Sequence, residues 1–330
     1  MREPDFWSSA SGGARVLRTV LSPAAWVYGK SVAWKAGRAK PFRARAKVIC
    51  VGNLTVGGTG KTPVSIAIAQ ALAKRGLNVA ILTRGYGGRA KGPLAVDREK
   101  DLANEVGDEP LIAAASVPVI VAHDRAAGAE FGDSHGADVI VMDDGHQNFS
   151  IAKDLSLVVV DAQTGFGNGR VLPAGPLREP VPQGLARADA VIMVGDGTPD
   201  LGSYKCPALR AHIVAHDKIG LNGKPAVAFA GIGRPEKFFN SLRELGADIL
   251  ETVAAADHHI YSASEIARLK AKARGSDALL ITTEKDFVRL TPAERDGIDY
   301  LPVQAAFDEP AALEQLLDRV CPRTVPPTPA

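Results

Sequence analysis

The sequence has 330 residues, of which 46% are apolar, and a formal net charge of +2 at pH 7. This length is enough for one large domain or two medium ones, and the near-neutral balance gives no sign of nucleic-acid binding. Its cysteines, Cys50, Cys206 and Cys321, form no CxxC pair, which indicates a reducing compartment without a disulfide framework or a zinc site. No apolar run reaches the roughly 20 residues of a membrane-spanning helix, and no secretory signal is expected.

The N-terminal part of the chain differs in charge from the rest. The first 47 residues carry a net charge of +8, which leaves −6 for the remainder, and they contain all three tryptophans. Basic residues are attracted to anionic membrane surfaces, and tryptophan favours the headgroup level. A helix is predicted over residues 14–35, kinked or started at Pro23, that lies on a membrane surface. The alternatives are a helix packed on the protein body and a basic organelle-targeting leader.

The next part of the chain alternates between apolar strands and helices. Near-continuous runs of Val, Ile and Leu are typical of strands buried on both faces of a parallel sheet, and strands separated by helices indicate βαβ units. We predict a helix over residues 63–74 and strands over 46–51, 78–83, 117–122, 138–142, 155–160 and 190–194. The fold class is therefore α/β, with a mostly parallel sheet as its core.

A second alternating series starts after polar, Pro- and Gly-containing turns near residues 200–225. Its predicted elements cover 226–230, 238–245, 249–253, 264–274 and 278–283. We place a domain boundary near residue 218, within about ten residues. The predicted organisation is a basic helical segment (1–45), a core domain (46–217) and a smaller α/β domain (218–330) whose Pro-rich tail is expected to be disordered.

The strongest motif is the segment VGNLTVGGTGKTP at residues 51–63, between a predicted strand and a predicted helix. Its glycines allow a tight turn whose N–H groups converge on phosphate oxygens, and the N-terminus of the helix adds a positive dipole. In such a loop Lys61 reaches the β- and γ-phosphates and Thr62 ligates Mg²⁺. The predicted nucleotide-binding residues are Thr55, Val56, Gly57, Gly58, Thr59, Gly60, Lys61 and Thr62.

One position of this loop departs from the standard pattern, which has Gly where this chain has Thr55. The loop is therefore a variant, and a chance Gly-rich turn is the alternative. The coincidence of Gly-Lys-Thr with the strand and the helix favours a P-loop, so the core is predicted to be P-loop NTPase-like.

A second acidic element, ADVIVMDDG, covers residues 137–145. An apolar strand that ends in a carboxylate is typical of the element that holds Mg²⁺, directly or through water, in P-loop proteins. Asp143 and Asp144 point to opposite sides if the strand continues, so we expect one to face the metal and the other to hold a loop. A strand-end turn capped by Asp-Gly is the alternative.

Phosphoryl transfer also needs a group that takes the proton of the acceptor hydroxyl. Four polar clusters could supply it: TRGYGG (83–88), GDEP (107–110), DHH (257–259) and TEKD (283–286). Taken singly, each is more often a turn or a cap than a catalytic site. Asp108 would fit a helix cap, and His258 with His259 would fit an exposed loop pair.

Together these motifs resemble those of the tetraacyldisaccharide 4'-kinases, the lipid A 4'-kinases of Gram-negative bacteria. The resemblance covers nearly the whole chain and includes Thr55, and this many motifs in order are highly specific. They are VGNLT (51–55), GGTGKTP (57–63), RGYGG (84–88), GDEP (107–110), DDG with Gln147, GNGR (167–170), LPAGPLREP (172–180), GIG (231–233), Pro235-Glu236, Phe238-Phe239, DHH (257–259) and TEKD (283–286).

The resemblance implies the reaction and its partners. The γ-phosphate of ATP would go to the 4'-hydroxyl of a tetraacylated glucosamine disaccharide 1-phosphate, giving lipid IVA. The N-terminal helix would rest on the cytoplasmic face of the bacterial inner membrane. The expected partners are therefore ATP, Mg²⁺, the lipid-linked disaccharide and the membrane surface, with no nucleic acid.

The resemblance also implies roles for single residues. Asp108 would take the hydroxyl proton, and a histidine of the DHH segment, with His258 favoured over His259, would orient it and tune its pKa. Lys61 and Asp144 complete the catalytic set. The residues implied for Mg²⁺ are Thr62, an acid of the Asp143–Asp144 pair, and Glu179. The residues implied for the substrate and its phosphates, which Arg matches bidentately, are Arg84, Tyr86, Arg178 and His259.

Two positions depart from the family pattern. The family often has DDGFQH where this chain has DDGHQN, so His146 and Asn148 inherit no role from the family histidine. After the DHH segment the family often has Pro, and here Ile260 and Tyr261 follow, which loosens the expected shape of that loop.

Two other functions compete with the kinase. Membrane-switching ATPases of the deviant-Walker class share GGxGKT, but they carry a Lys directly before the Gly pair, where this chain has Val56. Their membrane helix is also usually C-terminal. An ATP-dependent synthetase on the same fold would give no reason for an acid-free, Trp-bearing segment near the N-terminus.

Overall fold

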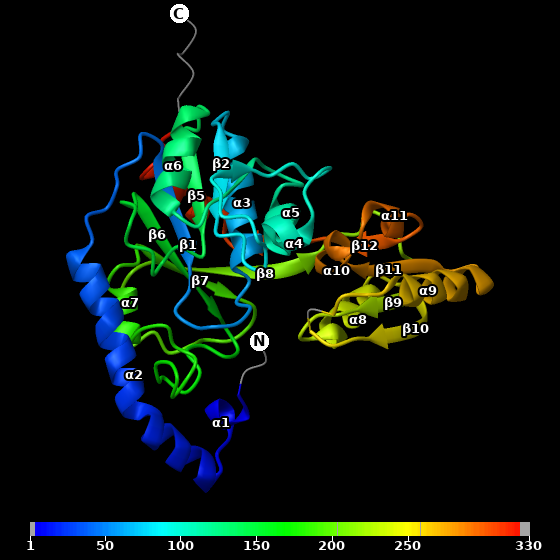
Figure 1. Cartoon of the computed structure of the whole chain (residues 1–330), viewed down its shortest axis with the longest axis horizontal. Helices are drawn as coiled ribbons and strands as arrows, with labels where there is room; N and C mark the ends of the chain where they lie inside the picture. The colour runs from blue at the N-terminus through cyan, green and yellow to red at the C-terminus, as the bar shows by residue number, and fades with distance from the viewer. Residues whose placement is uncertain (1–3, 203, 258, 324–330) are drawn as a thin grey trace, which may run out of the picture.

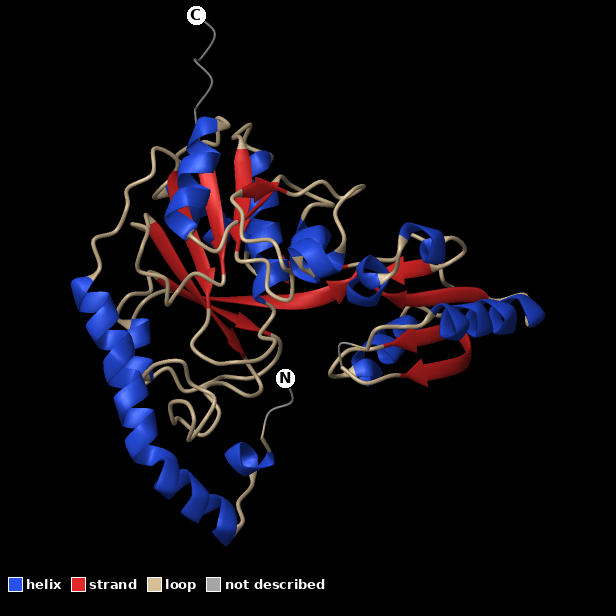
Figure 2. Cartoon of the chain, in the orientation of Figure 1, coloured by secondary structure: helices blue, strands red, loops and turns tan. Residues whose placement is uncertain are grey.

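The computed structural model describes residues 4–202, 204–257 and 259–323, and shows two α/β bodies with a long helix along one side (Figures 1 and 2). The strands of the larger body are β1 Lys47–Gly52, β2 Val79–Thr83, β3 Leu94–Ala95, β4 Val119–Val121, β5 Val139–Asp143, β6 Leu155–Asp161, β7 Ala190–Val194, β8 Ala208–Ala215 and β13 Val303–Phe307. Within the described residues they form one nine-stranded sheet, in the order β13-β8-β7-β6-β1-β5-β2-β4-β3. The sheet is parallel except at the β3–β4 and β13–β8 pairs.

The helices of this body lie before, between and after its strands. They are α1 Asp5–Ser8, α2 Gly12–Arg38, α3 Lys61–Ala73, α4 Ala103–Val106, α5 Asp108–Ala113, α6 Arg125–Ser134, α7 Val181–Leu185 and α12 Pro310–Asp318. All six strands predicted for the core are present, with ends that differ by at most two residues, and the predicted helix at 63–74 is α3. The predicted α/β class with a mostly parallel sheet is confirmed.

The strands of the sheet interior are buried on both faces, because alternate side chains pack under different helices. Ile49 and Val51 of β1 pack with Val64 and Ile68 of α3 in one apolar cluster. Cys50 of β1 packs instead in a cluster with α6. This two-sided cover explains the continuous apolar strands, and it brings the carboxyl ends of β1 and β5 together beside the start of α3, where ligands bind in such sheets.

The smaller body is a four-stranded parallel sheet in the order β10-β9-β11-β12 within the described residues. Its strands are β9 Pro225–Ala230, β10 Asp248–Ala254, β11 Leu279–Thr283 and β12 Asp299–Leu301. Its helices are α8 Pro235–Glu244, α9 Ala263–Gly275, α10 Glu284–Arg289 and α11 Pro292–Arg295. Phe238 and Phe239 of α8 pack on one face of β9, and Ile266 and Leu269 of α9 pack on the other.

After the smaller sheet the chain returns to the larger one. β13 pairs antiparallel with β8, so that Val303 faces Ala215. Leu313, Leu316 and Leu317 of α12 then join the apolar cluster beneath α3. The predicted C-terminal domain, residues 218–330, therefore includes a final part that packs on the core. We propose the smaller domain to be residues 218–301; the tail from residue 324 lies outside the described residues.

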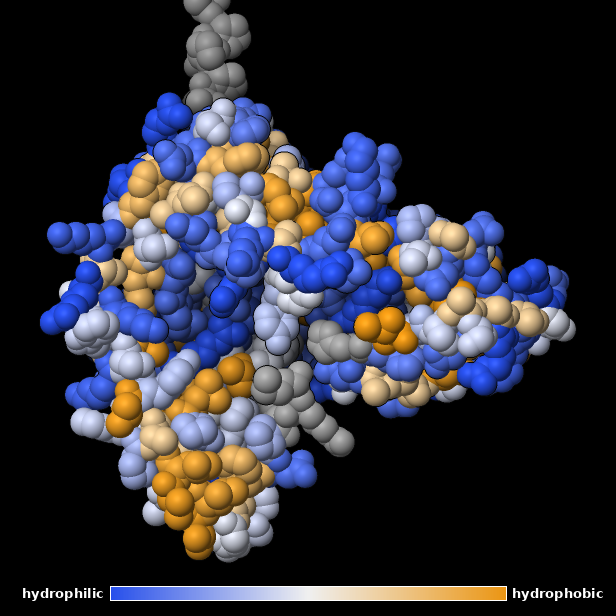
Figure 3. Space-filling model, in the orientation of Figure 1, coloured by the Kyte–Doolittle hydropathy of each residue, from blue (hydrophilic) through white to orange (hydrophobic). Residues whose placement is uncertain are grey.

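The long helix α2 lies along the edge of the larger body (Figure 1). It starts before Pro23 and runs through it, and its N-cap Ser11 accepts a hydrogen bond from the Ala14 N–H. Small residues such as Ala25 are its buried ones, whereas Trp26 is 66% exposed. Figure 3 shows apolar side chains gathered over α1 and the first turns of α2, where Val20 is exposed. Among the described residues no helix is long and apolar enough to cross a bilayer.

Candidate active site

The loop between β1 and α3 has the backbone geometry of a phosphate-binding turn. Gly57 and Gly60 have φ values of 106° and 83°, in the left-handed region that favours glycine. Asn53 is fully buried and donates from Nδ2 to the Thr59 Oγ1 at 3.2 Å, which braces the loop from within. The Val56 N–H donates to the Pro176 carbonyl at 2.8 Å and ties the loop to a neighbouring segment. The first N–H groups of α3 are thereby aimed at the space above the loop.

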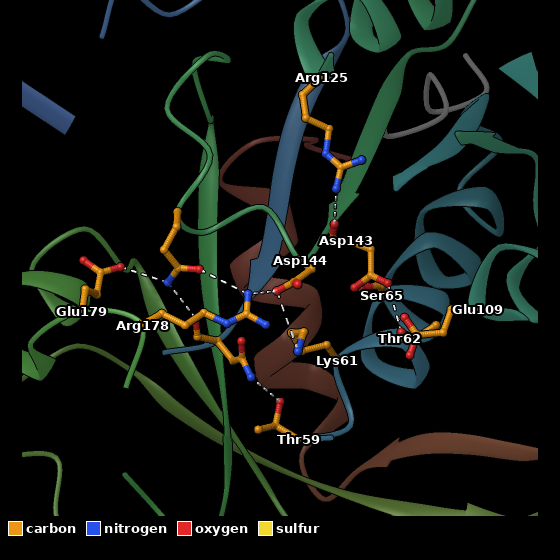
Figure 4. A network of polar contacts seen from close by, with 12 residues as sticks. Thr59, Lys61, Thr62, Ser65, Glu109, Arg125, Asp143, Asp144, Arg178 and Glu179 are labelled. Atoms are coloured by element: carbon orange, nitrogen blue, oxygen red, sulfur yellow. Dashed lines mark hydrogen bonds and ion pairs between the residues drawn. The ribbon is translucent and has the colours of Figure 1, made fainter. Parts of the chain in front are cut away.

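Asp143, the last residue of β5, is buried beside the start of α3. Its Oδ2 accepts a hydrogen bond from the Thr62 hydroxyl at 3.0 Å and its Oδ1 accepts one from Ser65 at 2.9 Å (Figure 4). Burial, with the nearby charge of Glu109, raises the pKa of Asp143 to about 6. Thr62 and Asp143, which were predicted from the sequence as ligands of Mg²⁺, are thus in direct hydrogen-bond contact.

Asp144 has a different environment, although it is the next residue. It has a φ of 52°, so the chain turns here and the carboxylate faces the phosphate loop. Its Oδ1 accepts a hydrogen bond from Arg178 at 2.7 Å and lies 3.7 Å from the Lys61 ammonium (Figure 4). Burial opposes ionisation, but the two cations outweigh it and hold the pKa of Asp144 below its usual range. Asp144 therefore stands ionised beside the lysine that is predicted to bind phosphate.

Glu179 is linked to Asp144 through the side chains of Gln147 and Arg178. It is 2% exposed, and both of its oxygens accept hydrogen bonds from Arg187 at 2.7 Å. Its Oε1 also accepts one from Gln147 at 2.9 Å. In the part of the chain that the structure describes, no cluster of three or more His, Cys, Asp or Glu side chains suits a metal ion. The salt bridge to Arg187 holds Glu179 next to Gln147, and the predicted role of Glu179 at Mg²⁺ stays a prediction.

Asp108 is the first residue of α5 and lies where the two bodies meet. Its Oδ2 accepts a hydrogen bond from Arg289 of α10 at 2.5 Å, and its Oδ1 accepts one from the Glu109 N–H at 3.1 Å. Glu109 in turn pairs with Lys285 at 3.1 Å. The charge of Glu109 contributes to the raised pKa of Asp143. The start of α5 is therefore close to the phosphate loop.

The predicted histidine site is described only in part, because His258 lies outside the described residues. His259 Nε2 lies 3.1 Å from Glu265 Oε1, and its ring packs edge-on against Tyr261. Glu265 is also the capping-box carboxylate of α9. This contact ties His259 to the start of α9, and its predicted substrate-binding role stays a prediction.

The segment with Arg84 and Tyr86 lies next to the start of α5. Arg84 is exposed and Tyr86 is 70% exposed. A Cβ added at Gly107, whose φ is 95°, would lie 2.7 Å from the Tyr86 carbonyl oxygen, so the two segments are in close contact. The structure thus brings both predicted substrate-binding residues to the same edge as Asp108.

Several polar residues of this region were not predicted from the sequence. Ser65 lies one helical turn after Thr62, and that spacing could have indicated that it shares the face toward Asp143. Arg125 is 4% exposed and donates to the carbonyls of Ala122 and Asp143 at 3.0 and 3.3 Å. Burial lowers the pKa of Arg125 to about 10, and the side chain fixes the end of β5. No local sequence signal marks such a long-range brace.

A glycine-rich loop lies between a parallel strand and a helix, its threonine contacts the strand-end Asp143, and its lysine lies beside Asp144. These features define a P-loop nucleotide-binding protein. The sequence model of the tetraacyldisaccharide-1-P 4'-kinase family matches residues 17–321. The chain belongs to that family.

Individual relatives agree with this assignment. The chain is 48% identical to a tetraacyldisaccharide 4'-kinase of Rhodospirillum centenum, and the match covers 96% of each protein. It is 46% identical to one of Rhodospirillum rubrum, over 97% of this chain and 98% of that protein. Among solved structures, the "apo" form of LpxK from Aquifex aeolicus in complex with ATP superimposes with a TM-score of 0.75 at 27% identity, covering 92% of this chain and 99% of the other.

Proposed function

We propose that this chain is an ATP-dependent kinase that phosphorylates the 4'-hydroxyl of tetraacyldisaccharide 1-phosphate and gives lipid IVA. The observation that carries the proposal is the contact set of Lys61, Thr62, Asp143 and Asp144, in a chain that belongs to this kinase family. Two enzymes named for this reaction match 96% and 97% of the chain.

The phosphate loop would hold the triphosphate of ATP. The backbone N–H groups of residues 57–62 would donate to phosphate oxygens. Lys61 lies 3.7 Å from Asp144 and has a side chain that is 12% exposed, so its ammonium is held at the mouth of the loop. An incoming γ-phosphate would offer Lys61 a second anionic partner and would draw the ammonium toward the site of transfer.

The donor set beside the loop fits Mg²⁺. The Thr62 hydroxyl and the Asp143 carboxylate are hard oxygen ligands of the kind that this ion prefers, and they already lie in hydrogen-bond contact. Thr62 and an acid of the Asp143–Asp144 pair would hold the ion. Bound there, Mg²⁺ would supply charge neutralisation at the β- and γ-phosphates.

The acceptor hydroxyl would be presented to Asp108, which serves as the general base. The support is positional: Asp108 starts the helix next to the phosphate loop and adjoins the exposed Arg84 and Tyr86. His258 would orient Asp108, as the family resemblance implies. Arg178, which donates to Asp144, stands where it would contact a phosphate at the same loop.

We propose that α2 binds the membrane surface and so brings the active site to its lipid substrate. Its exposed Val16, Val20, Trp26, Val27 and Trp34 are 58–67% exposed, and the segment is basic and free of acidic residues. Such a face would lie on the headgroup region of an anionic bilayer. We therefore place the enzyme on the cytoplasmic face of the bacterial inner membrane, bound peripherally.

The direct test is a transfer assay. Purified protein is mixed with ATP labelled at the γ-phosphate, MgCl₂ and tetraacyldisaccharide 1-phosphate in detergent, and products are separated as lipid and aqueous fractions. The proposal expects label in a lipid with one added phosphate. Label that appears only as free phosphate would support a membrane-associated ATPase instead.

A further inference from the structure

The inference concerns Arg289, whose side chain connects the two bodies of the molecule. Arg289 ends α10 in the smaller body, and its Nη2 donates to the Asp108 Oδ2 of the larger body at 2.5 Å. Both side chains are 12% exposed, so this ion pair is largely shielded from solvent. In such surroundings a charged hydrogen bond is stronger and more directional than it is on an open surface.

The other edge of the guanidinium is fixed within the smaller body. Arg289 Nη1 lies 3.2 Å from the Oδ1 of Asp286 and 3.3 Å from the Gly231 carbonyl oxygen. Asp286 is 0% exposed and accepts hydrogen bonds at Oδ2 from the Gly231 N–H at 2.9 Å and from Thr283 at 2.7 Å. Arg289 is therefore a planar fork between a rigid anchor and Asp108, a geometry that Lys does not reproduce.

The charge of Arg289 also fits the needs of a base beside a triphosphate. Asp108 adjoins Glu109, and Glu109 lies close enough to Asp143 to raise its pKa. Bound ATP would add further negative charge, which disfavours an ionised carboxylate nearby. The Arg289 guanidinium, hydrogen-bonded to Asp108, offsets that repulsion.

We propose that Arg289 is a positioning residue for phosphoryl transfer, which holds the Asp108 carboxylate in its orientation only when the smaller body is docked on the larger one. The inference rests on the proposed role of Asp108 as the general base. Arg289 would act through Asp108 and would leave nucleotide binding at the phosphate loop unaffected. Docking of the two bodies would thus complete the active site, since one side of the base is supplied by α10.

The test compares substitutions at Arg289 with a matched arginine. Arg289→Gln is expected to lower kcat about 10–100-fold with KM for ATP within about twofold, because misplacing one reacting group has this scale of effect. Arg289→Lys keeps the charge but loses the fork, so it is expected to lower kcat about threefold to fivefold. The control is Arg295→Gln, since within the described residues the hydrogen bonds of Arg295 go only to the Phe287 and Val288 carbonyls of α10.

The control separates positioning from general destabilisation of α10. Arg295→Gln is expected to retain kcat within about twofold even where its melting temperature falls as far as that of Arg289→Gln. Equal losses of kcat in the two variants would overturn the inference. If Arg289→Gln does not accumulate as folded protein, Arg289→Lys decides: a reduced kcat at unchanged KM for ATP supports the inference, and a kcat equal to that of the parent contradicts it.

A double-mutant cycle distinguishes this inference from the proposed role of Asp108. If Arg289 acts through Asp108, adding Arg289→Gln to Asp108→Asn lowers kcat by less than twofold further. If Asp108→Asn abolishes transfer while Arg289→Gln retains it, only the present inference fails. Should Asp108→Asn itself transfer phosphate at the parent rate, the base assignment and the inference fall together.

Discussion

Asp143 and Asp144 show how two adjacent carboxylates acquire opposite proton affinities. Asp143 is buried at the end of a strand, next to hydroxyl groups, and its pKa is raised to about 6. Asp144 turns toward Lys61 and Arg178, and its pKa is lowered. The sequence predicted that the two side chains would face different ways, but the partners of Asp144 depend on contacts between distant segments, which no local pattern encodes.

The first prediction concerns Lys61. Lys61→Ala is expected to lower kcat/KM about 10²–10³-fold, because it removes a cation from the point where charge develops during transfer. It also takes one of two cations away from Asp144. Steady-state kinetics with ATP as the varied substrate measures the effect. Lys74→Ala, at the exposed far end of α3, is the control and is expected to match the parent. A Lys61→Ala variant that bound and consumed ATP normally would contradict the phosphate-loop assignment.

The second prediction concerns the pH dependence of stability through His146. This ring is 1% exposed, with Nε2 at 2.9 Å from the Gly184 carbonyl oxygen and Nδ1 at 3.2 Å from Ser156. Burial, with the nearby charge of Lys153, lowers the pKa of His146 to about 4 from a usual 6.5. Below pH 6.5 the unfolded chain therefore binds a proton that the folded protein does not, so stability falls until the pH reaches about 4.

The expected loss through His146 alone is about 3 kcal/mol between pH 6.5 and 4. Urea unfolding of the parent and of His146→Gln at several pH values measures it. The variant lacks this titration, so its free energy of unfolding should fall less steeply over the same range. Parallel curves for the two proteins would show that His146 does not carry the effect.

At the scale of single elements, the sequence predicted those helices, strands and turns that depend mainly on neighbouring residues. The strand before the phosphate loop, the loop itself and α3 follow from apolar runs and glycine spacing. The helix α2 was also predicted, although its path through Pro23 was one of two alternatives. The pairing of β8 with β13 escaped prediction, because the two strands are separated in sequence by the whole smaller sheet.

The third prediction concerns the exposed face of α2. Replacing Trp26 and Trp34 by Ser is expected to reduce binding to anionic liposomes several-fold, because these side chains are 66% and 58% exposed and favour the headgroup level. Sedimentation with vesicles that contain anionic phospholipid measures binding. Leu250→Ser, a substitution at an exposed apolar residue of the smaller body, is the control and should bind as the parent does. Unchanged sedimentation of the tryptophan variant would refute the role of α2.

At the scale of the whole molecule, the C-terminal helix stabilises the nucleotide-binding sheet from the far end of the sequence. Arg75, just after α3, donates to the carbonyl of Cys321 at 2.8 Å and pairs with Asp318 at 2.9 Å. Leu317 is 0% exposed in the cluster beneath α3. The domain boundary expected from composition placed this helix with the smaller sheet. Composition shows where the second alternating series begins, but it does not show that the chain later returns to the larger sheet.

The fourth prediction follows from this packing. Leu317→Ala is expected to destabilise the protein by about 2–5 kcal/mol, since it leaves a cavity in a close-packed cluster. Thermal unfolding measured with and without ATP reports the loss. Leu250→Ala removes the same atoms from a residue that is 47% exposed on β10, and its effect should stay within about 1 kcal/mol. Similar losses for both variants would contradict the role of α12 in the core.

The paired strands β8 and β13 also determine how the smaller body can move. Because Val303 faces Ala215 and the His216 N–H donates to the Pro302 carbonyl at 2.9 Å, the chain leaves for the smaller sheet and returns from it at adjacent points. The connection between the two bodies is this pair of hydrogen-bonded strands. Such a connection can bend as a hinge, but its two strands stay together. Bending at this connection would move α10 relative to the larger body and break the contact between Arg289 and Asp108.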